Sequence, residues 1–380
     1  MDKRIKYVTY YGDKDMTCLR SNSPAADTKT DYVIDTLNRC GYTVELISHS
    51  SISIPGFYYK GKVENRGQNT IRYFGSFGVS KFKILNVLNW MYRDIVFLLW
   101  CLFHIKRGEQ IIVYHSLGYD SIFIWLNKIK KIRIVGEIEE IYQDVHKQSA
   151  RRSRNEYRFI DCCEKYIFPT ASLDSKLNSA KKPAVIIHGL YSVEPRRDIE
   201  PFENGKINVV YAGTLDPQKG GAAAAAAAAY LPENYHIHIL GFGDKKQIDS
   251  ILRLIKDIND SSRADVSYDG FLQGEEFIRF LQKCQIGLST QDPTAIFNST
   301  SFPSKILTYL SNGLRVVSVR IPAIENSGVG HAMFYYDEQE PAKIANAIIK
   351  CGESGDVVES TALLNELDRA FVRELDELLS

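Results

Sequence analysis

The sequence is poor in methionine and tryptophan, with four and three residues, and it has no excess of charge of either sign. Its 47 Lys and Arg residues nearly balance 46 Asp and Glu residues, which leaves a formal net charge of +1. A balanced charge produces no broad field that would attract nucleic acid. We therefore expect no nucleic acid partner and an ordinary globular protein.

The seven cysteines form neither a zinc motif nor a disulfide framework. They are odd in number and scattered, and no C-x-x-C pair or companion histidine spacing occurs. Free thiols fit a reducing compartment, and no metal site is expected. The N-terminus MDKRIKYVTYYG shows neither the hydrophobic run nor the cleavage site of a signal peptide. We therefore expect a cytoplasmic protein.

One segment, Ile84–Ile105, is long and apolar enough to be compared with a membrane span. Two asparagines and the adjacent Arg93 and Asp94 interrupt it, and a charged pair near the centre of a span is costly. The segment favours a largely buried helix that covers a sheet. The alternative is a helix in the membrane interface, with Trp90 and Trp100 among the headgroups, which would place the protein peripherally on the inner face of the cell membrane.

The length of the chain and its alternation of segments predict the fold class. At 380 residues the chain exceeds the size of a single hydrophobic core. Short apolar runs alternate with segments of helical period, which is typical of α/β proteins with parallel sheets. We predict two doubly wound, Rossmann-like domains that face an interdomain cleft, at residues 1–192 and 207–359. A linker at 193–206 joins them, and a helix at 360–380 can pack back on the first domain.

The individual elements follow from the same patterns, and the alanine run Ala222–Ala229 predicts a further helix without an assigned function. The predicted strands are Lys6–Tyr11, Thr43–Ser48, Gln110–His115, Arg133–Ile138, Lys165–Pro169, Ala184–His188, Ile207–Ala212, His236–Leu240, Asp265–Tyr268, Gln285–Leu288 and Arg315–Val319. The other predicted helices include Thr28–Cys40, Lys81–Lys106, Asp120–Lys130, Ser153–Cys163, Ser172–Asn178 and Ser360–Leu379.

The strongest local motif is VYAGTLDPQKGG at Val210–Gly221, a strand that enters a glycine turn and then a helix. Gly213 and Thr214 begin the turn, and Lys219 stands beside its backbone amides. Helix N-termini carry a partial positive charge, so such a turn suits an anion, and a diphosphate is a suitable ligand. A simple strand-to-helix turn with a solvated lysine is the alternative.

Two later segments add chemistry of the same kind. HILGFGD ends a strand with Gly241 and Gly243, which allow close approach of a ligand, although G-x-G is often only a tight turn. In SFPSKILTYLSNGLRVVS, Ser304 and Lys305 fall in the first turn of a helix, where a hydroxyl, free amides and an ammonium group converge. A core helix followed by a core strand is the alternative, and it leaves Ser304 and Lys305 unexplained.

Together with YDGFL at Tyr268–Leu272, these segments resemble the retaining GT-B glycosyltransferases of the family-4 type, a large bacterial group that builds capsule, lipopolysaccharide and exopolysaccharide glycans. The resemblance covers Ile207–Ile349 well and the first half loosely. It implies a GT-B fold and transfer of a sugar, typically a hexose, from a nucleotide-diphosphate sugar to a glycan or a lipid-linked glycan. It also implies a UDP-sugar more often than a GDP-sugar, and no required metal or other cofactor.

The resemblance assigns roles to individual residues of the second half. The diphosphate charge would be met by Lys219, Ser304 and Lys305, together with helix dipoles. The other positions that it places around the donor are Gly213, Thr214, Gly241, Gly243, Phe271 and Thr308. The family often has an arginine where this chain has Thr214, and paired glutamates where it has Thr300 and Thr308. These departures leave the ribose and sugar contacts unassigned.

In the first half, the resemblance indicates an acceptor loop and a carboxylate. Small residues before a helix, Asn22, Ser23 and Ala25, would line the acceptor site, with a surface loop as the alternative. Glu139, or else Glu140, follows a strand where relatives carry an acidic residue or a histidine near the donor sugar. The alternative is a solvated strand end.

His115 is a weaker catalytic candidate because it closes a predicted strand, where a histidine is more often structural. Two other functions stay open for the whole chain. One is a GT-B sugar-nucleotide epimerase, which needs no acceptor. The other is a non-catalytic GT-B subunit that binds a nucleotide sugar within a transferase complex, as the threonines at 214, 300 and 308 suggest.

Overall fold

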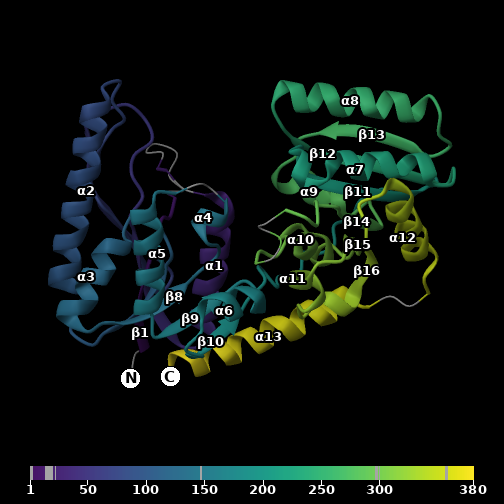
Figure 1. Cartoon of the computed structure of the whole chain (residues 1–380). Helices are drawn as coiled ribbons and strands as arrows, with labels where there is room; N and C mark the ends of the chain where they lie inside the picture. The colour runs from purple at the N-terminus through teal and green to yellow at the C-terminus, as the bar shows by residue number, and fades with distance from the viewer. Residues whose placement is uncertain are drawn as a thin grey trace. The chain divides into compact units, whose positions relative to one another are not determined.

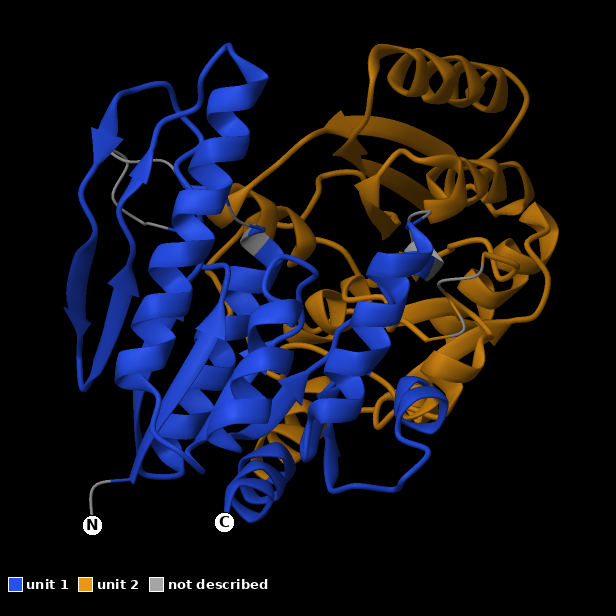
Figure 2. Cartoon of the chain, turned by 60° about the vertical axis from the view of Figure 1, so that its left-hand side comes forward, with its two compact units in different colours: residues 1–169, 173–187, 370–380 blue, residues 170–172, 188–369 orange. Residues whose placement is uncertain are grey.

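The computed structural model describes residues 3–12, 20–21, 23–145, 148–295, 298, 300–355 and 358–380. The chain divides into two compact units (Figure 2). Unit 1 comprises Met1–Pro169, Leu173–Ile187 and Ala370–Ser380. Unit 2 comprises Thr170–Ser172 and His188–Arg369. Each unit is an α/β body with its own parallel sheet (Figure 1), which confirms the predicted fold class.

The sheet of unit 1 has eight strands in the order β10-β9-β8-β7-β1-β2-β5-β4, and only β4 runs antiparallel to its neighbour. The strands are β1 (Lys3–Thr9), β2 (Tyr42–Ser48), β4 (Lys62–Arg66), β5 (Asn69–Tyr73), β7 (Gln110–Tyr114), β8 (Arg133–Glu137), β9 (Lys165–Phe168) and β10 (Ala184–Ile186). The helices are α1 (Pro24–Arg39), α2 (Lys83–His104), α3 (Asp120–Lys130), α4 (Tyr142–Val145), α5 (Ala150–Cys162) and α6 (Ala171–Leu177).

Four strands of unit 1 were not expected from the sequence: β4, β5 and the small antiparallel pair of β3 (Tyr58–Tyr59) and β6 (Ser76–Phe77). β4 reads KVENR and is solvent-exposed at alternate positions, as an edge strand can be. It has no apolar run, and only its pairing with β5 reveals it as a strand.

Helix α2 is not largely buried, which corrects the preferred expectation for this segment. It is the one helix in the described part of the chain whose length and composition would allow it to cross a membrane. Only 22% of its most apolar 18-residue stretch is buried. Its covered face joins the core of unit 1 through Phe97, Trp100 and Cys101. Trp100 is 8% exposed and stacks on His104 with ring centroids 4.8 Å apart, so it is not available to lipid headgroups.

The sheet of unit 2 has six parallel strands in the order β13-β12-β11-β14-β15-β16. They are β11 (Ile207–Thr214), β12 (Tyr235–Phe242), β13 (Asp265–Gly270), β14 (Ile286–Ser289), β15 (Arg315–Val319) and β16 (Met333–Tyr336), of which β16 was not expected. The helices are α7 (Gly221–Ala226), α8 (Lys245–Asn259), α9 (Gly274–Leu281), α10 (Lys305–Ser311), α11 (Pro322–Glu325) and α12 (Pro341–Glu353). The alanine run forms α7 and a short 3-10 helix at Ala227–Tyr230.

The C-terminal helix α13 (Ser360–Leu379) starts in unit 2 and ends in unit 1. In unit 1, buried Phe371 stacks on Tyr32 of α1 with ring centroids 6.0 Å apart. Asp376 lies 2.8 Å from the Lys3 Nζ at the start of β1. The end of α13 is therefore held to unit 1 by an aromatic contact, an ion pair and hydrogen bonds, in which Gln110 of β7 and Lys165 of β9 donate to the carbonyls of Leu379 and Leu378.

Candidate functional site

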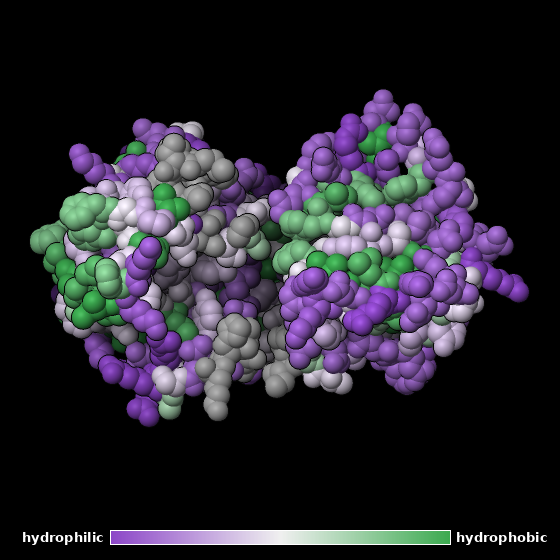
Figure 3. Space-filling view, turned by 90° about the horizontal axis from the view of Figure 1, so that it is seen from above, coloured by the Kyte–Doolittle hydropathy of each residue, from purple (hydrophilic) through white to green (hydrophobic). Residues whose placement is uncertain are grey.

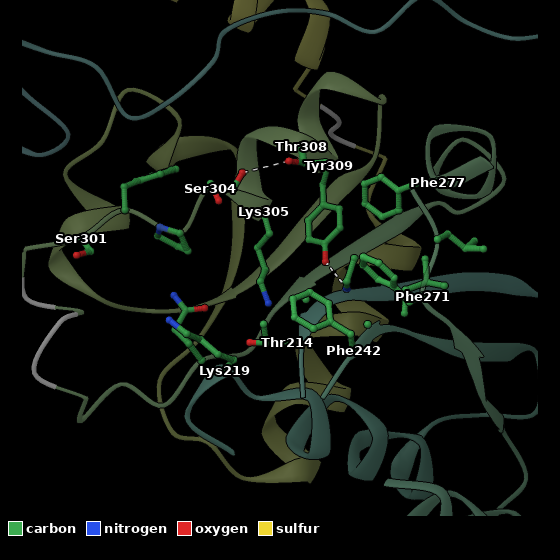
Figure 4. A pocket seen from close by; sticks show the side chains of 18 of the residues that line it. Thr214, Lys219, Phe242, Phe271, Phe277, Ser301, Ser304, Lys305, Thr308 and Tyr309 are labelled. Carbon is green, nitrogen blue, oxygen red and sulfur yellow. Dashed lines mark hydrogen bonds between the residues drawn. The ribbon is translucent and has the colours of Figure 1, made fainter. Parts of the chain in front are cut away.

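A cavity of about 480 Å³ lies in unit 2, where β11 and β12 end (Figure 4). Its walls are residues 212–214 of β11, residues 240–242 of β12, the segment after β13 with Phe271, and the start of α10. Parallel α/β sheets bind ligands at the carboxyl ends of their strands. The cavity is therefore placed as a binding site of such a sheet would be.

Most of the donor residues indicated by the sequence line this cavity. They are Gly213, Thr214, Lys219, Gly241, Phe271, Ser304, Lys305 and Thr308. Gly243 is outside the lining. A Cβ atom added to it would lie 2.6 Å from the Gln247 side chain, which closes the capping box of α8 with Asp244. The small size of Gly243 thus has a local structural reason.

Lys305 carries the most unusual charge in the cavity. Its Nζ is buried and has no hydrogen-bond partner among the described residues. It lies 3.9 Å from the centre of the Tyr211 ring, a cation–π contact. Burial, and secondarily the charge of Lys219, lower the pKa of Lys305 to about 7. Figure 4 shows its side chain extending from α10 towards Thr214.

Gln291 brings a second unsatisfied donor to the same cavity. The residue follows β14, is buried and lines the cavity. Its Oε1 accepts a hydrogen bond of 2.8 Å from Ser289, which leaves its Nε2 buried without a partner within the described residues. A buried donor without an acceptor costs about 1–3 kcal/mol. Lys305 and Gln291 therefore fit a ligand rich in acceptor oxygens.

Glycines let the backbone approach closely around these donors. A Cβ atom on Gly213 would lie 3.2 Å from the Lys305 Nζ, and one on Gly241 would lie 1.9 Å from the Gly213 carbonyl oxygen. The hydroxyl of Tyr211 is 2.9 Å from the carbonyl oxygens of both Thr214 and Lys219, and so fixes the turn between them. The turn, held by the Tyr211 hydroxyl, forms one wall of the cavity.

Gly220, at the end of this turn, has no room for a side chain. It has φ +86°, and a Cβ atom there would lie 1.6 Å from the Thr290 carbonyl oxygen. We expect Gly220→Ala to reduce the free energy of unfolding by about 3 kcal/mol or more, since backbone strain and a clash combine. Gly205, with φ +62° and open space, is the matched control. Gly205→Ala should cost only about 1 kcal/mol in urea unfolding, and equal losses in both variants would contradict the argument.

Tyr309 was not predicted from the sequence as a site residue, yet it lines the cavity and connects three of the elements around it. Its hydroxyl accepts a hydrogen bond from the Ala212 N–H at 2.8 Å and donates one to the Leu288 carbonyl at 3.2 Å. It thereby connects α10 with β11 and β14. Gly287 makes room for it, because a Cβ atom there would lie 2.3 Å from the ring.

Two aromatic side chains line the cavity and remain half-exposed. Phe242 and Phe271 are 51% and 52% exposed, and their rings meet edge to face with centroids 5.0 Å apart. Only Phe271 was indicated by the sequence. Phe242 could have been found as the side chain between the two glycines at the end of β12. Exposed aromatic faces at a cavity suit the stacking of a planar ligand.

Three polar residues in or just before α10, Thr300, Ser304 and Thr308, have different surroundings. Thr300 is buried outside the lining, and its carbonyl accepts a hydrogen bond of 2.7 Å from Thr170. Thr308 lines the cavity, with its hydroxyl 3.4 Å from the Ser304 carbonyl. Ser304 is exposed, and its side chain does not cap α10. No acidic residue occurs in the described lining of the cavity.

In unit 1, the carboxylates at the end of β8 have basic and hydroxyl partners that the sequence did not indicate. Glu139 pairs with Lys29 of α1, and the Lys29 Nζ is 3.9 Å from the Glu137 Oε1. Tyr7 donates a hydrogen bond to Glu137. Burial raises the pKa of Glu137 to about 7, against the opposing effect of Lys29. Glu140, the residue after Glu139, is partly exposed.

His115 is buried beside the rings of Tyr142 and Phe159. Its Nε2 lies 3.8 Å from Asp120 and 3.7 Å from Glu156. Burial lowers the pKa of His115 to about 4, so the imidazole is neutral at pH 7. These surroundings match the structural alternative for this residue.

The predicted acceptor loop is described only in part. Asn22 lies outside the described residues. Ser23 and Ala25 are exposed at the start of α1, and Ser23 makes no capping hydrogen bond with its side chain. Across the described ranges there is no group of three or more His, Cys, Asp or Glu residues that could hold a metal ion.

Residues 206–354 match the model of the family described as glycosyl transferases group 1. No curated protein matches the sequence. Similar solved structures include E. coli trehalose-6-phosphate synthase bound with UDP-2-fluoro glucose, at a TM-score of 0.65 and 12% identity over 98% of this chain and 96% of that one. Anabaena HepE in complex with UDP and glucose gives a TM-score of 0.58 at 14% identity, over 98% and 95%.

A third similar structure is the UDP-forming alpha,alpha-trehalose-phosphate synthase from Burkholderia xenovorans in complex with glucose-6-phosphate, at a TM-score of 0.63 and 11% identity over 98% and 96%. At such low identities, the likeness to the solved structures shows only the fold. The match to the family model concerns only residues 206–354, which lie in unit 2. These findings give the chain the GT-B fold, and they show that residues 206–354, within unit 2, are similar to the group 1 glycosyl transferases.

Proposed function

We propose that this protein is a retaining glycosyltransferase that binds a nucleotide-diphosphate sugar in the cavity of unit 2. It transfers the sugar to a glycan or lipid-linked glycan acceptor in the synthesis of a bacterial surface polysaccharide. The observation that carries the proposal is the buried Lys305 Nζ, which has no hydrogen-bond partner in the described part of the chain and lines a cavity of about 480 Å³.

A diphosphate supplies the hydrogen-bond acceptors that the buried donors of the cavity lack. Its oxygens are acceptors only, and both unsatisfied donors, the Lys305 Nζ and the Gln291 Nε2, are buried there. Lys219 adds positive charge on the same cavity wall. Preorganised positive groups stabilise the negative charge that develops on a leaving diphosphate, which lowers the barrier to sugar transfer. No step in this scheme uses a metal.

The aromatic pair fits the base of the nucleotide. Phe242 and Phe271 lie at the ends of β12 and β13, in the wall of the cavity that also holds Gly241. The UDP and UDP-2-fluoro glucose in the named neighbours support a uridine nucleotide as the first one to test. Stacking on aromatic side chains is worth about 1–3 kcal/mol per base.

This assignment of the base predicts the effect of removing the two rings. Phe242→Ala and Phe271→Ala should each weaken UDP binding about tenfold, measured by calorimetry. Inorganic pyrophosphate lacks a base, and its binding should stay within about twofold of that of the unchanged protein. The control is Leu252→Ala, which changes an exposed apolar side chain on α8. Equal losses for UDP and pyrophosphate would contradict a base at this position.

The acceptor side belongs to unit 1 in this proposal. Glu139, held by Lys29, is the first candidate for the group that receives the proton of the acceptor hydroxyl, and Glu140 is the second. Retention requires the new bond to form on the face of the sugar that the diphosphate leaves. The test is transfer with a UDP-sugar and a lipid-linked acceptor, with the anomeric configuration of the product read by NMR.

A second function is favoured by the absence of acidic residues from the described cavity lining. Thr308 occupies a position where the family has a glutamate, and Thr300 is buried outside the lining. A non-catalytic subunit would keep the diphosphate site and do without those carboxylates. It would bind UDP-sugar with no acceptor-dependent release of UDP. An epimerase would instead alter the sugar of the donor when no acceptor is present.

A further inference from the structure

Helix α2 has apolar residues on two opposite faces, and only one face is covered by the rest of unit 1. The covered residues are Asn89, Phe97, Trp100 and Cys101. On the other side lie Ile84, Leu88, Met91 and Ile95, and Ile84 is 70% exposed. Their spacing of four, three and four residues places them on a single stripe of the helix. The second stripe is therefore not explained by the core of unit 1.

Further exposed side chains widen this stripe into a surface. We call it the α2 surface, and its residues are Phe82, Ile84, Leu85, Val87, Leu88, Trp90, Met91, Ile95, Leu99 and Phe103. Figure 3 shows hydrophobic side chains gathered on the left-hand side, the side on which Figure 1 draws α2. Large contiguous apolar patches on soluble proteins usually mark a site of protein or membrane contact.

The charges at both ends of the α2 surface are positive. Lys81 and Lys83 precede or open the helix, Lys106 and Arg107 follow it, and all four are exposed. Asp94 is the one acidic residue of α2. Its side chain is 41% exposed, and its Oδ1 lies 3.3 Å from a nitrogen of Arg93, which offsets its charge, and 3.2 Å from the Nε2 of His49, whose pKa is lowered by burial. The exposed ends therefore attract an anionic partner.

These charges distinguish a lipid surface from a second copy of the chain. Two α2 helices packed antiparallel would bring the basic start of one against the basic end of the other. Like charges placed opposite each other disfavour that pairing. An anionic bilayer matches both features, because it accepts apolar side chains below its headgroups and basic side chains at their level.

We propose that the α2 surface is a membrane-docking site, with α2 lying in the plane of a bilayer that contains anionic lipid. The apolar stripe from Ile84 to Ile95 enters the acyl boundary. Phe82 and Phe103, at opposite ends of the helix, and Trp90 between them, lie at the interface. The inference is independent of the cavity in unit 2, and it would also bring the protein to a lipid-linked acceptor.

Vesicle co-sedimentation tests the proposal. The full chain should pellet with phosphatidylcholine vesicles that contain about a third phosphatidylglycerol, and at least about tenfold less with phosphatidylcholine alone. Combined Ile84→Gln, Leu88→Gln and Met91→Gln should reduce the pelleted fraction on anionic vesicles at least about tenfold. Leu252→Gln on α8, an exposed apolar-to-polar change away from α2, should pellet like the unchanged protein.

Combined Lys81→Gln and Lys83→Gln keep the apolar stripe, and they should also reduce binding to anionic vesicles. If the triple variant does not fold, this lysine variant tests membrane docking in its place. An unchanged protein that stays in the supernatant with both vesicles would overturn the proposal. So would a dimer that the triple variant converts to a monomer in sedimentation velocity. A thermal shift with UDP in the same preparations tests the nucleotide site separately, so either idea can fail alone.

Discussion

Replacing Lys305 by methionine is expected to weaken diphosphate binding strongly while raising the melting temperature of the protein. Methionine has a similar length and can occupy the space beside Tyr211 and Gly213 without burying an unpaired charge. Even for a paired set of buried charges, replacement by well-packed apolar residues is often neutral or stabilising by about 1–4 kcal/mol. We therefore expect a Tm increase of about 2 °C or more by calorimetry without ligand.

The same variant should lose about 100-fold or more in kcat/KM for the donor, since a buried charged contact to the leaving group is removed. Lys246→Met, on an exposed turn of α8, is the matched control and should change neither quantity. A Lys305 variant that melts lower and keeps its activity would show that the lysine serves the fold. Opposite signs for stability and activity are the signature of a functional site.

UDP binding should weaken as the pH rises above about 7. Because the pKa of Lys305 in the unliganded protein is about 7, most molecules have a neutral amine at pH 8. A diphosphate binds the ammonium form, so binding draws a proton from the solution. Affinity should fall about tenfold per pH unit between about 7.5 and 9, because the binding-competent fraction falls by that factor.

Calorimetry at pH 8 in two buffers of different ionisation enthalpy measures the proton directly. We expect an uptake of nearly one proton per UDP bound, and none in Lys305→Met. Uridine, which has no phosphate, should bind without a dependence on pH in this range. A flat profile for UDP would mean that Lys305 does not contact the diphosphate.

The same pKa shift has a consequence for stability. The pKa of Lys305 is lowered on folding, so the unfolded chain holds more protons than the folded one between about pH 7 and 10.5. The free energy of unfolding therefore gains a contribution that rises with pH across this window. The penalty of burying the ammonium is fully present below pH 7, where Lys305→Met should gain most stability.

The sequence predicted the buried strands well. It did not predict the strands that are recognisable only from their pairing with a neighbouring strand. β7, β11 and β14 each contain an unbroken run of three or more apolar residues, and such runs are distinctive without any knowledge of their neighbours. β4 is a polar edge strand, and β3 and β6 have two residues each. Their strand character is a property of the assembled sheet, which a local pattern does not contain.

For the site, the residues in local motifs were found and those brought in by the fold were missed. Lys219 and Lys305 belong to glycine and proline turns that have a sequence signature, and both line the cavity. Gln291 and Tyr309 read as ordinary residues after a strand and inside a helix. Their importance depends on an unsatisfied amide and on a hydroxyl that joins three elements.

A crystal structure of the protein with UDP tests the central claim most directly. The account predicts a phosphate oxygen within about 3 Å of the Lys305 Nζ, with the uracil against Phe242 or Phe271. UDP bound elsewhere, or bound in the cavity while Lys305 keeps its contact with Tyr211 and touches no phosphate, would contradict it.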